Sequence, residues 1–466
     1  MRALGRSLAA AVLIGASVAA GAEAPARLDA QYRETANRIL SAALTDDGAW
    51  DKLTYLCDHI GHRMSGSPAL EQAVAWAAEQ MKADGLENVR LQPVKVPHWV
   101  RGRESARVVE PIDKPLNMLG LGNSIGTPAA GITAPVVVVG NFEELDALGP
   151  SKVRGNIVLF DMPWEGYGRT RVYRTDGASR AAKLGAVAIL IRSVTGVALY
   201  APHTGSVTYT SEGKIPAAAL TVEDAAWIRQ MTAAGQRIQV RLQMEAQMLP
   251  DADSGNVMGE IRGGELPDEV VVLGGHIDSW DVGQGAHDDG AGVVAAWQAV
   301  MLMHQLGLRP RRTVRVIGWT NEENGARGGE AYRAALGDTV KKHVAAIEMD
   351  GGAERPVGFG VTIPGASPDS PQLKAAMDRA AQIGKLLDGI QAGAITSGGG
   401  GTDIGPLTTA GVPSMGLNTV GEHYFDWHHS NADTLDKVNL QDFRKCIAAL
   451  AVMAYILADM PGTLGN

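Results

Sequence analysis

The hydrophobic positions in the first half of the chain follow two different patterns. Between Leu28 and about Leu86 they recur at helical spacing, and only a turn-like segment from His59 to Pro68 interrupts them. From about Leu116 to Met248, short apolar runs of strand length alternate with Gly- and Pro-rich loops. Within this part, helices are expected only near Ser179 to Leu184 and near Val222 to Met231. The change in pattern indicates a β-rich domain inserted into a different one.

After Ser254 the pattern becomes strand, loop and helix in repeated order. Apolar runs that suit central strands buried on both faces occupy residues 269–276, 313–320, 344–350 and 413–418. Helices are expected near residues 292–306, 329–336, 370–383 and 440–458. The alternation predicts an α/β fold, with a mixed sheet that is mostly parallel at its centre and flanked by helices. We therefore predict one domain made of residues 25–115 and 249–466, with residues 116–248 inserted into it.

The first 24 residues have the pattern of an export signal. Arg2 and Arg6 precede an apolar run from Leu8 to Ala20, and Ala22-Glu23-Ala24 offers the small residues that a signal peptidase accepts. The run contains a glycine and a serine, and it is shorter than the roughly 20 apolar residues needed to span a membrane. We predict that residues 1–24 are a cleaved signal peptide and that the protein is exported, either to a periplasm or outside the cell.

Charge and cysteine content narrow the partners and the chemistry. The formal net charge is −9, and no cluster of Lys and Arg is present, so nucleic acid and anionic membranes are poor partners. Cys57 and Cys446 are the only cysteines, and each lies in an apolar helical pattern. Two buried thiols are therefore the preferred interpretation, although export would permit a disulfide.

Histidines and acids follow the predicted central strands. His276 ends one strand and Asp278 comes two residues later, Glu322 and Glu323 follow the next strand, and Asp350 ends the third. In an open α/β sheet, the loops at the carboxyl ends of the strands form the ligand crevice. Side chains that are far apart in sequence are therefore expected to converge there. Imidazole and carboxylate groups are ligands that suit zinc, so the sequence predicts a metal site.

The number of these residues indicates two metal ions rather than one. A two-ion centre needs a bridging carboxylate and about two further ligands for each ion. Asp288 lies in a Gly-rich loop at the start of a predicted helix and is the natural bridge. His276 and Asp350 would hold one ion, and Glu323 would hold the other together with a later histidine.

The same loops supply the remaining chemistry. Adjacent side chains on an extended backbone point in different directions, so Glu323 can bind metal while Glu322 faces the attacking water as general base. Asp278 could accept the other N–H of the first imidazole and fix its tautomer. On spacing alone, the later histidine is either His428 or His429.

Five segments carry a resemblance to a known family: residues 274–292, 319–332, 345–352, 400–407 and 428–438. They resemble, in the same order, the co-catalytic zinc aminopeptidase and carboxypeptidase family, and within it the carboxypeptidase Q branch. The resemblance implies a zinc exopeptidase fold with an inserted protease-associated domain and two zinc ions. It places the roles on His276, Asp288, Glu323, Asp350 and His429 as ligands, on Glu322 as base and on Asp278 as the acid that supports His276. His429 is preferred over His428 because the family ligand lies four residues before the Asp of an Asp-Thr pair.

The resemblance also bears on the substrate. It implies a dipeptidase that requires free termini, and it suggests a homodimer. Many aminopeptidase relatives have His after Ser-Asp, whereas this chain has Ile404 after Thr402-Asp403, which argues against a plain aminopeptidase. The Gly-rich stretch that includes Gly400, Gly401, Thr402 and Asp403 could bind a substrate carboxylate through backbone N–H groups; a flexible turn explains it equally well.

Three alternatives remain beside this hypothesis. An aminopeptidase with the same di-zinc centre would differ in substrate, and a one-zinc glutaminyl cyclase would differ in metal count. A non-catalytic binding ectodomain could share the fold, but the intact ligand set argues against it. Residues 122–126 also match G-x-S-x-G of serine hydrolases. That pattern needs a strand before it and a helix after it, whereas Thr127-Pro128 and Gly131 follow here.

Overall fold

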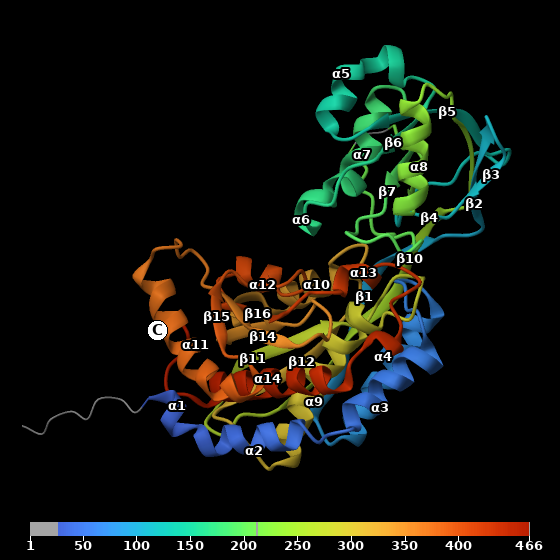
Figure 1. Cartoon of the computed structure of the whole chain (residues 1–466). Helices are drawn as coiled ribbons and strands as arrows, with labels where there is room; N and C mark the ends of the chain where they lie inside the picture. The colour runs from blue at the N-terminus through green and yellow to red at the C-terminus, as the bar shows by residue number, and fades with distance from the viewer. Residues whose placement is uncertain (1–26, 211–212, 466) are drawn as a thin grey trace, which may run out of the picture.

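The computed structural model describes residues 27–210 and 213–465, which form two lobes (Figure 1). The predicted signal peptide, residues 1–24, lies outside the described residues. The lower lobe contains both ends of the described chain, and the upper lobe is formed by the middle of the sequence (Figure 1). Among the described residues, no helix combines the length and the apolar character needed to cross a membrane.

The lower lobe is built on an eight-stranded mixed sheet. Its order is β1-β10-β12-β11-β13-β16-β14-β15, and the four central strands β12, β11, β13 and β16 run parallel. The bounds are β1 (Glu87–Val100), β10 (Gln247–Ile261), β11 (Leu266–His276), β12 (Arg312–Trp319), β13 (His343–Glu348), β14 (Pro356–Thr362), β15 (Ala394–Ser397) and β16 (Ser414–Thr419). The predicted mixed α/β fold is thus confirmed, and the four apolar runs are the four central strands.

Helices cover both faces of this sheet. One face packs against α4 (Pro68–Ala83), α9 (Ala291–Gln305), α11 (Pro371–Gly384) and α14 (Leu440–Asp459). Outside this layer, α2 (Arg33–Ala43) packs on α9 and α14, and α3 (Gly48–Thr54) packs on α9. The other face packs against α10 (Arg327–Leu336) and α12 (Gly405–Thr409). Every residue of α9 from Ala291 to Met303 is buried, as expected of a helix that is apolar on all sides.

The upper lobe has its own eight-stranded sheet, in the order β3-β2-β9-β5-β6-β7-β8-β4. Its elements are β2 (Glu104–Glu110), β3 (Lys114–Leu116), β4 (Met118–Gly120), β5 (Ile132–Val139), α5 (Phe142–Val153), β6 (Ile157–Phe160), α6 (Tyr167–Thr170), α7 (Val172–Lys183), β7 (Ala188–Arg192), β8 (Ala217–Leu220), α8 (Val222–Ala233) and β9 (Gln239–Met244). Strand β2 precedes residue 116, at which the sequence predicts that the insertion begins; the domain limits stay a prediction.

Two helices of the upper lobe differ from the prediction. Helix α7 begins at Val172 rather than near Ser179, because its first two turns carry charged and polar side chains that mask the apolar spacing. Helix α5 was not expected, since a Gly149-Pro150 pair interrupts it and few of its residues are buried. Asn141 nevertheless starts it as an N-cap whose side chain accepts a hydrogen bond from the N–H of Glu144 at 2.8 Å.

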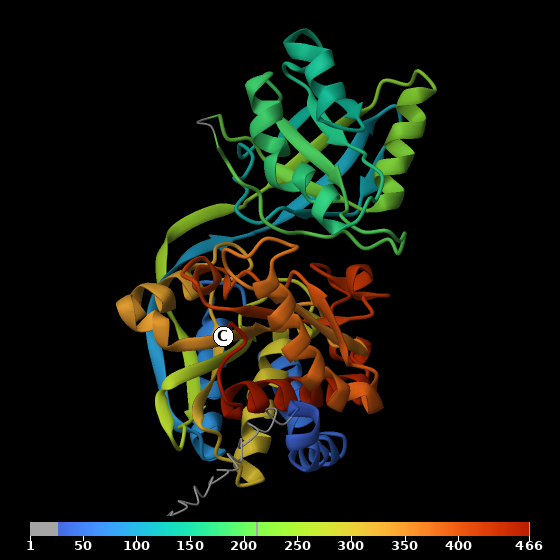
Figure 2. The same cartoon turned by 90° about the vertical axis from the view of Figure 1, so that its left-hand side faces the viewer.

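Two long antiparallel strands join the lobes. Strands β1 and β10 pair from Glu87 and Glu260 at one end to Val100 and Gln247 at the other, and they rise along one side of the molecule into the upper lobe (Figure 2). Directly after β1, Arg101 makes two hydrogen bonds to Asp281 of the lower lobe, at 2.8 and 2.6 Å. This partly buried bidentate pair helps to fix how the upper lobe sits over the lower one.

The fold predicts a loss of stability in mild acid through His343. Tyr332 Oη lies 2.8 Å from His343 Nε2, and burial, together with the nearby Arg315, lowers the pKa of His343 to about 4. The unfolded chain takes up a proton near pH 6.5, so the stabilisation is complete above that pH and is lost as the pH falls toward 4.

The variant His343→Gln isolates this effect, because it keeps an acceptor for Tyr332 but cannot ionise. Between pH 7 and pH 4.5 the wild type should lose about 2 kcal/mol more unfolding free energy than the variant, measured by urea denaturation. Equal losses in the two proteins would show that His343 is not held neutral.

Candidate metal centre

The five predicted ligand residues come from different parts of the lower lobe. His276 is the last residue of β11, Asp350 lies two residues after β13, and Glu323 lies in the turn after β12. Asp288 lies between β11 and α9, and His429 follows α13 (Tyr424–Trp427). Because the central strands are parallel, their carboxyl ends meet at one edge of the sheet, where these side chains converge.

Asp288 lies between two histidines. Its Oδ1 is 3.2 Å from His276 Nε2, and its Oδ2 is 3.2 Å from His429 Nε2. Asp350 Oδ1 lies 3.5 Å from the same nitrogen of His276, and Glu323 Oε2 lies 3.2 Å from that of His429. The two oxygens of one carboxylate therefore face two separate groups of side chains that were predicted as ligands.

These separations fit a metal ion. Ligands held about 2.0–2.1 Å from a tetrahedral zinc ion are about 3.3 Å from one another. The buried Nε2 of His276 and Oδ2 of Asp288 have no hydrogen-bond partner among the described residues. Buried polar atoms without partners are costly, so their presence here is explained by a cation that these atoms would share.

His428 lies beside this centre. Its ring stacks on that of His429 with the centroids 3.6 Å apart, and its Nε2 is 3.5 Å from Asp288 Oδ2. Asp288, His428 and His429 could on distance alone hold an ion. His429 has the additional contact with Glu323, which favours it as the ligand.

Burial makes the acids around Asp288 hard to ionise, whereas the two histidines beside Asp288 hold the pKa of its own carboxyl well below the usual value. Burial raises the pKa of Glu323 to about 8 and that of Asp350 to about 6, and nearby carboxylates add to both shifts. Glu348, two residues before Asp350, likewise has its pKa raised to about 8 by burial. Carboxylates packed this closely in a low dielectric need a compensating positive charge to be ionised at neutral pH.

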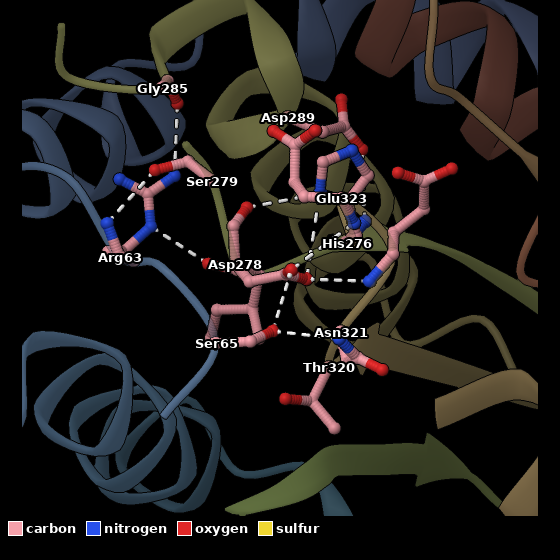
Figure 3. Close-up of polar contacts among 12 residues, drawn as sticks. Arg63, Ser65, His276, Asp278, Ser279, Gly285, Asp289, Thr320, Asn321 and Glu323 are labelled. Carbon is pink, nitrogen blue, oxygen red and sulfur yellow. Dashed lines mark hydrogen bonds and ion pairs between the residues drawn. The ribbon is translucent and has the colours of Figure 1, made fainter. Parts of the chain in front are cut away.

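Asp278 holds the turn that carries the two glutamates (Figure 3). Its carboxylate accepts hydrogen bonds from the N–H of Glu322 at 3.0 Å, the N–H of Glu323 at 3.4 Å and Ser65 Oγ at 3.3 Å. The predicted extended backbone at the glutamates is wrong, because residues 322–325 form a turn. The Nδ1 of His276 lies 3.0 Å from the main-chain oxygen of Asp278 and 3.8 Å from its Oδ1, so the main chain is its hydrogen-bond partner.

Arg63 is a functional candidate that the sequence did not single out. Its side chain is fully buried and donates to the main-chain oxygens of Gly61, Ile277, Gln284 and Gly285 at 2.7–3.0 Å. Figure 3 shows Arg63 beside Gly285. Arg63 thereby ties the segment after His276 to the segment before Asp288. The feature of the sequence that could have pointed to Arg63 is its position in the turn-like segment that interrupts the N-terminal helices.

Comparison with known proteins accounts for both lobes. The family model described as peptidase family M28 matches residues 256–454, and the model of the PA domain matches residues 132–228. Carboxypeptidase Q of Mus musculus is 42% identical over 436 residues, which cover 92% of this chain and 90% of that protein. The chain belongs to peptidase family M28.

Solved structures agree with this M28 assignment. The peptidase M28 precursor from Shewanella amazonensis matches with a TM-score of 0.88 and 32% identity, covering 93% of this chain and 98% of that one. The zinc aminopeptidase BSAP from Bacillus subtilis matches with a TM-score of 0.66 and 18% identity, covering 90% of this chain and 96% of that one, and shows the shared fold. The predicted resemblance and the inserted PA domain are confirmed.

A cavity of about 460 Å³ lies in front of the M28 centre and is lined by both lobes. Asp288, Glu322 and Thr402 are among the residues that the lower lobe contributes, and the PA domain contributes Arg171 and Ser206, among others. The lobes also touch through aromatic rings, since Tyr167 of α6 stacks on Phe425 of α13 with the centroids 5.0 Å apart. The sequence did not indicate that the inserted domain lines the site.

The Gly-rich stretch is divided between two surroundings. Thr402 lines the cavity at the centre, and with Gly400 and Gly401 it also lines an adjoining cavity of about 400 Å³. Asp403 is fully buried, and neither of its carboxylate oxygens has a hydrogen-bond partner among the described residues. Asp403 therefore lies behind the cavity surface.

Asp278→Asn tests the turn described above. Asn offers one accepting oxygen in place of two, so at least one donor among Glu322, Glu323 and Ser65 loses its partner. We expect a loss of about 1–3 kcal/mol of unfolding free energy, measured by urea denaturation. The exposed Asp369→Asn is the matched control and should change stability by less than about 0.5 kcal/mol. A loss in Asp278→Asn no larger than in the control would contradict the role of the carboxylate.

Proposed function

We propose that this chain is a zinc-dependent exopeptidase that hydrolyses short peptides, chiefly dipeptides with free termini. The observation that carries the proposal is the position of Asp288, whose two carboxylate oxygens each lie 3.2 Å from a different histidine. A carboxylate shared in this way is the arrangement that a two-ion hydrolase requires. Membership of peptidase family M28 supports the same activity.

Two zinc ions are the proposed cofactors. His276 and Asp350 would hold one, Glu323 and His429 would hold the other, and Asp288 would serve both. Zinc bound here would lower the pKa of a water molecule and would polarise the carbonyl group of the scissile bond. The imidazole and carboxylate donors suit zinc, and their separations fit its bond lengths.

Glu322 is the proposed general base. Its side chain is half-buried and lines the cavity beside Glu323, and its main-chain N–H is held by Asp278 at 3.0 Å. In that position its carboxylate would take a proton from the attacking water and pass it to the nitrogen of the departing amine. The contacts of Asp278 make it a positioning residue for this base.

The cavity supports a short substrate. The cavity has a volume of about 460 Å³ and lies under the PA domain. The PA domain limits the space for a substrate on the side away from the proposed metal ligands. Gly400, Gly401 and Thr402 are proposed to contact the peptide backbone, with Asp403 supporting them from behind. The relative named carboxypeptidase Q supports removal of a C-terminal residue.

An aminopeptidase with the same centre is the second candidate, since the Bacillus subtilis zinc aminopeptidase shares the fold. The side chain that follows Asp403 argues against it, because Ile404 is fully buried in the apolar layer under α12 and offers no polar group to the substrate.

We also propose that the chain is exported, with residues 1–24 as signal peptide, and that it acts in a periplasm or outside the cell. Homodimerisation stays a prediction.

The variant Glu322→Gln tests the mechanism. The ligand atoms are unchanged, so the protein should retain zinc, while the rate of dipeptide hydrolysis falls by about 100-fold or more because the base is lost. Metal content and kcat are measured on the same preparation. The exposed Glu330→Gln on α10 is the matched control and should behave as wild type. Full turnover by Glu322→Gln would exclude this base.

A panel of dipeptides tests the substrate. A dipeptide with both termini free should be cleaved, and cleavage should stop with a chelator and return with added zinc. The same dipeptide acetylated at its N-terminus or amidated at its C-terminus should be cleaved at least about 10-fold more slowly, as expected when a charged terminus is bound. Equal rates on the amidated peptide would favour the aminopeptidase, and no zinc-dependent cleavage of any peptide would overturn the proposed function.

A further inference from the structure

A short segment of the PA domain, His203–Ser206, reaches the loop that carries His429. The N–H of Thr204 donates to the main-chain oxygen of His429 at 2.8 Å. The main-chain oxygen of Thr204 lies 3.4 Å from His429 Nδ1, beside Arg174 Nη1, which lies 3.3 Å from the same ring nitrogen. Thr204 therefore contacts both the backbone and the ring of a residue whose other nitrogen, Nε2, faces Asp288 and Glu323.

The neighbours of Thr204 hold the adjoining parts of the same centre. His203 Nδ1 lies 2.6 Å from the main-chain oxygen of His428. A main-chain carbonyl oxygen can only accept, so Nδ1 of His203 is the donor in this hydrogen bond. Ser206 Oγ donates to the main-chain oxygen of Glu323 at 2.6 Å. One segment thus contacts both loops of the Glu323 and His429 pair.

The backbone of His429 requires such support. Its φ is 60°, in the left-handed region that residues other than glycine adopt at a cost. A conformation of this kind persists only where the surroundings hold it in place. The hydrogen bonds from Thr204 and His203 act on the two peptide groups beside this residue, and so they oppose relaxation of the loop.

The segment is itself rigidly anchored. His203 and Thr204 are buried, with 2% and 0% of their surface exposed. Thr204 Oγ1 donates to Gly120 O at 2.8 Å, and the N–H of His203 donates to Ser193 Oγ at 2.8 Å. A buried segment that is fixed at both of these points can determine the position of what it contacts.

We infer that His203–Ser206 is a positioning element of the metal centre, acting on the ion proposed for Glu323 and His429. The inference rests on the proposed zinc function. Thr204, His203 and Ser206 donate to the main-chain oxygens of His429, His428 and Glu323. They thereby orient the two residues that would bind this ion, which is how the partners of metal ligands raise metal affinity. The effect is confined to one side, because the contacts described reach His429, His428 and Glu323 and not His276 or Asp350.

Zinc binding to the full-length protein tests this directly. The metal-free protein is titrated with zinc in competition with a coloured chelator, and the affinities of the two equivalents are resolved. His203→Leu removes the donor to His428, and Ser206→Ala removes the donor to Glu323. In each variant one equivalent should bind about 10- to 100-fold more weakly, while the other stays within about threefold of wild type.

Two matched variants serve as controls. His203→Asn retains an N–H group near the place of Nδ1 and should restore most of the affinity. Ser124→Ala removes another buried hydroxyl of the upper lobe, which hydrogen-bonds to Ile125 and Ala217 without touching a ligand loop, and should bind both equivalents as wild type does. The thermal midpoints of all metal-free proteins are compared, so that general destabilisation is detected.

The outcomes separate this inference from the proposed function. Wild-type affinity for both equivalents in His203→Leu and Ser206→Ala would overturn the positioning role, and so would equal weakening of both equivalents. If His203→Leu does not fold, Ser206→Ala alone decides, since it removes a single hydroxyl. A wild-type protein that binds no zinc would instead overturn the proposed function.

Discussion

The charge balance around Asp288 is the constraint on which the rest of the structure depends. Each of the two carboxylate oxygens of Asp288 lies 3.2 Å from a histidine, and each histidine has a further carboxylate within 3.5 Å. Without a cation, burial and mutual repulsion raise the pKa of Glu323 to about 8 and oppose its ionisation. The neighbouring histidines lower the pKa of Asp288 itself, and a metal ion would supply the positive charge that the remaining carboxylates need. The fold therefore has to hold these side chains together before the metal binds.

Other buried side chains meet this requirement, because they hydrogen-bond to the main chain of the segments that carry the centre. Asp433 accepts from the N–H groups of His287 and Asp288 at 2.8 and 3.2 Å, and Asp289 accepts from the N–H of His276 at 3.0 Å. Asp278 and Arg63 do the same for the neighbouring turns. Because these contacts fix the backbone rather than the ends of the side chains, each predicted ligand has only its own rotamer left to adopt. The site is preorganised by the peptide chain.

The sequence predicts the parts of this arrangement that depend on side-chain type. Apolar runs identify the four central strands, and the polar residues that follow them identify His276, Glu323 and Asp350. Asp288 was identified from its Gly-rich loop, and His429 was preferred over His428 only through the family resemblance. Strands β14 and β15 were not expected, because Gly358 and Gly360 in one and the exposed residues of the other give no continuous apolar run. The partner of His276 was also misjudged, since the choice between the carboxylate and the carbonyl of Asp278 depends on a local turn that spacing does not encode.

The contacts between the PA domain and the centre could not be predicted from the sequence, and the reason is more general. Thr204 acts through its main-chain N–H and C=O, which every residue except proline possesses, so no residue type at position 204 would have revealed the contact. The approach depends instead on the reach of β1 and β10 and on the Arg101–Asp281 pair, which set one lobe over the other. When backbone groups of another domain complete a centre, the sequence can indicate this only through residues such as His203 and Ser206, whose side chains also contact the loops of the centre. Patterns of side chains therefore identify the ligands of such a site more readily than the elements that position them.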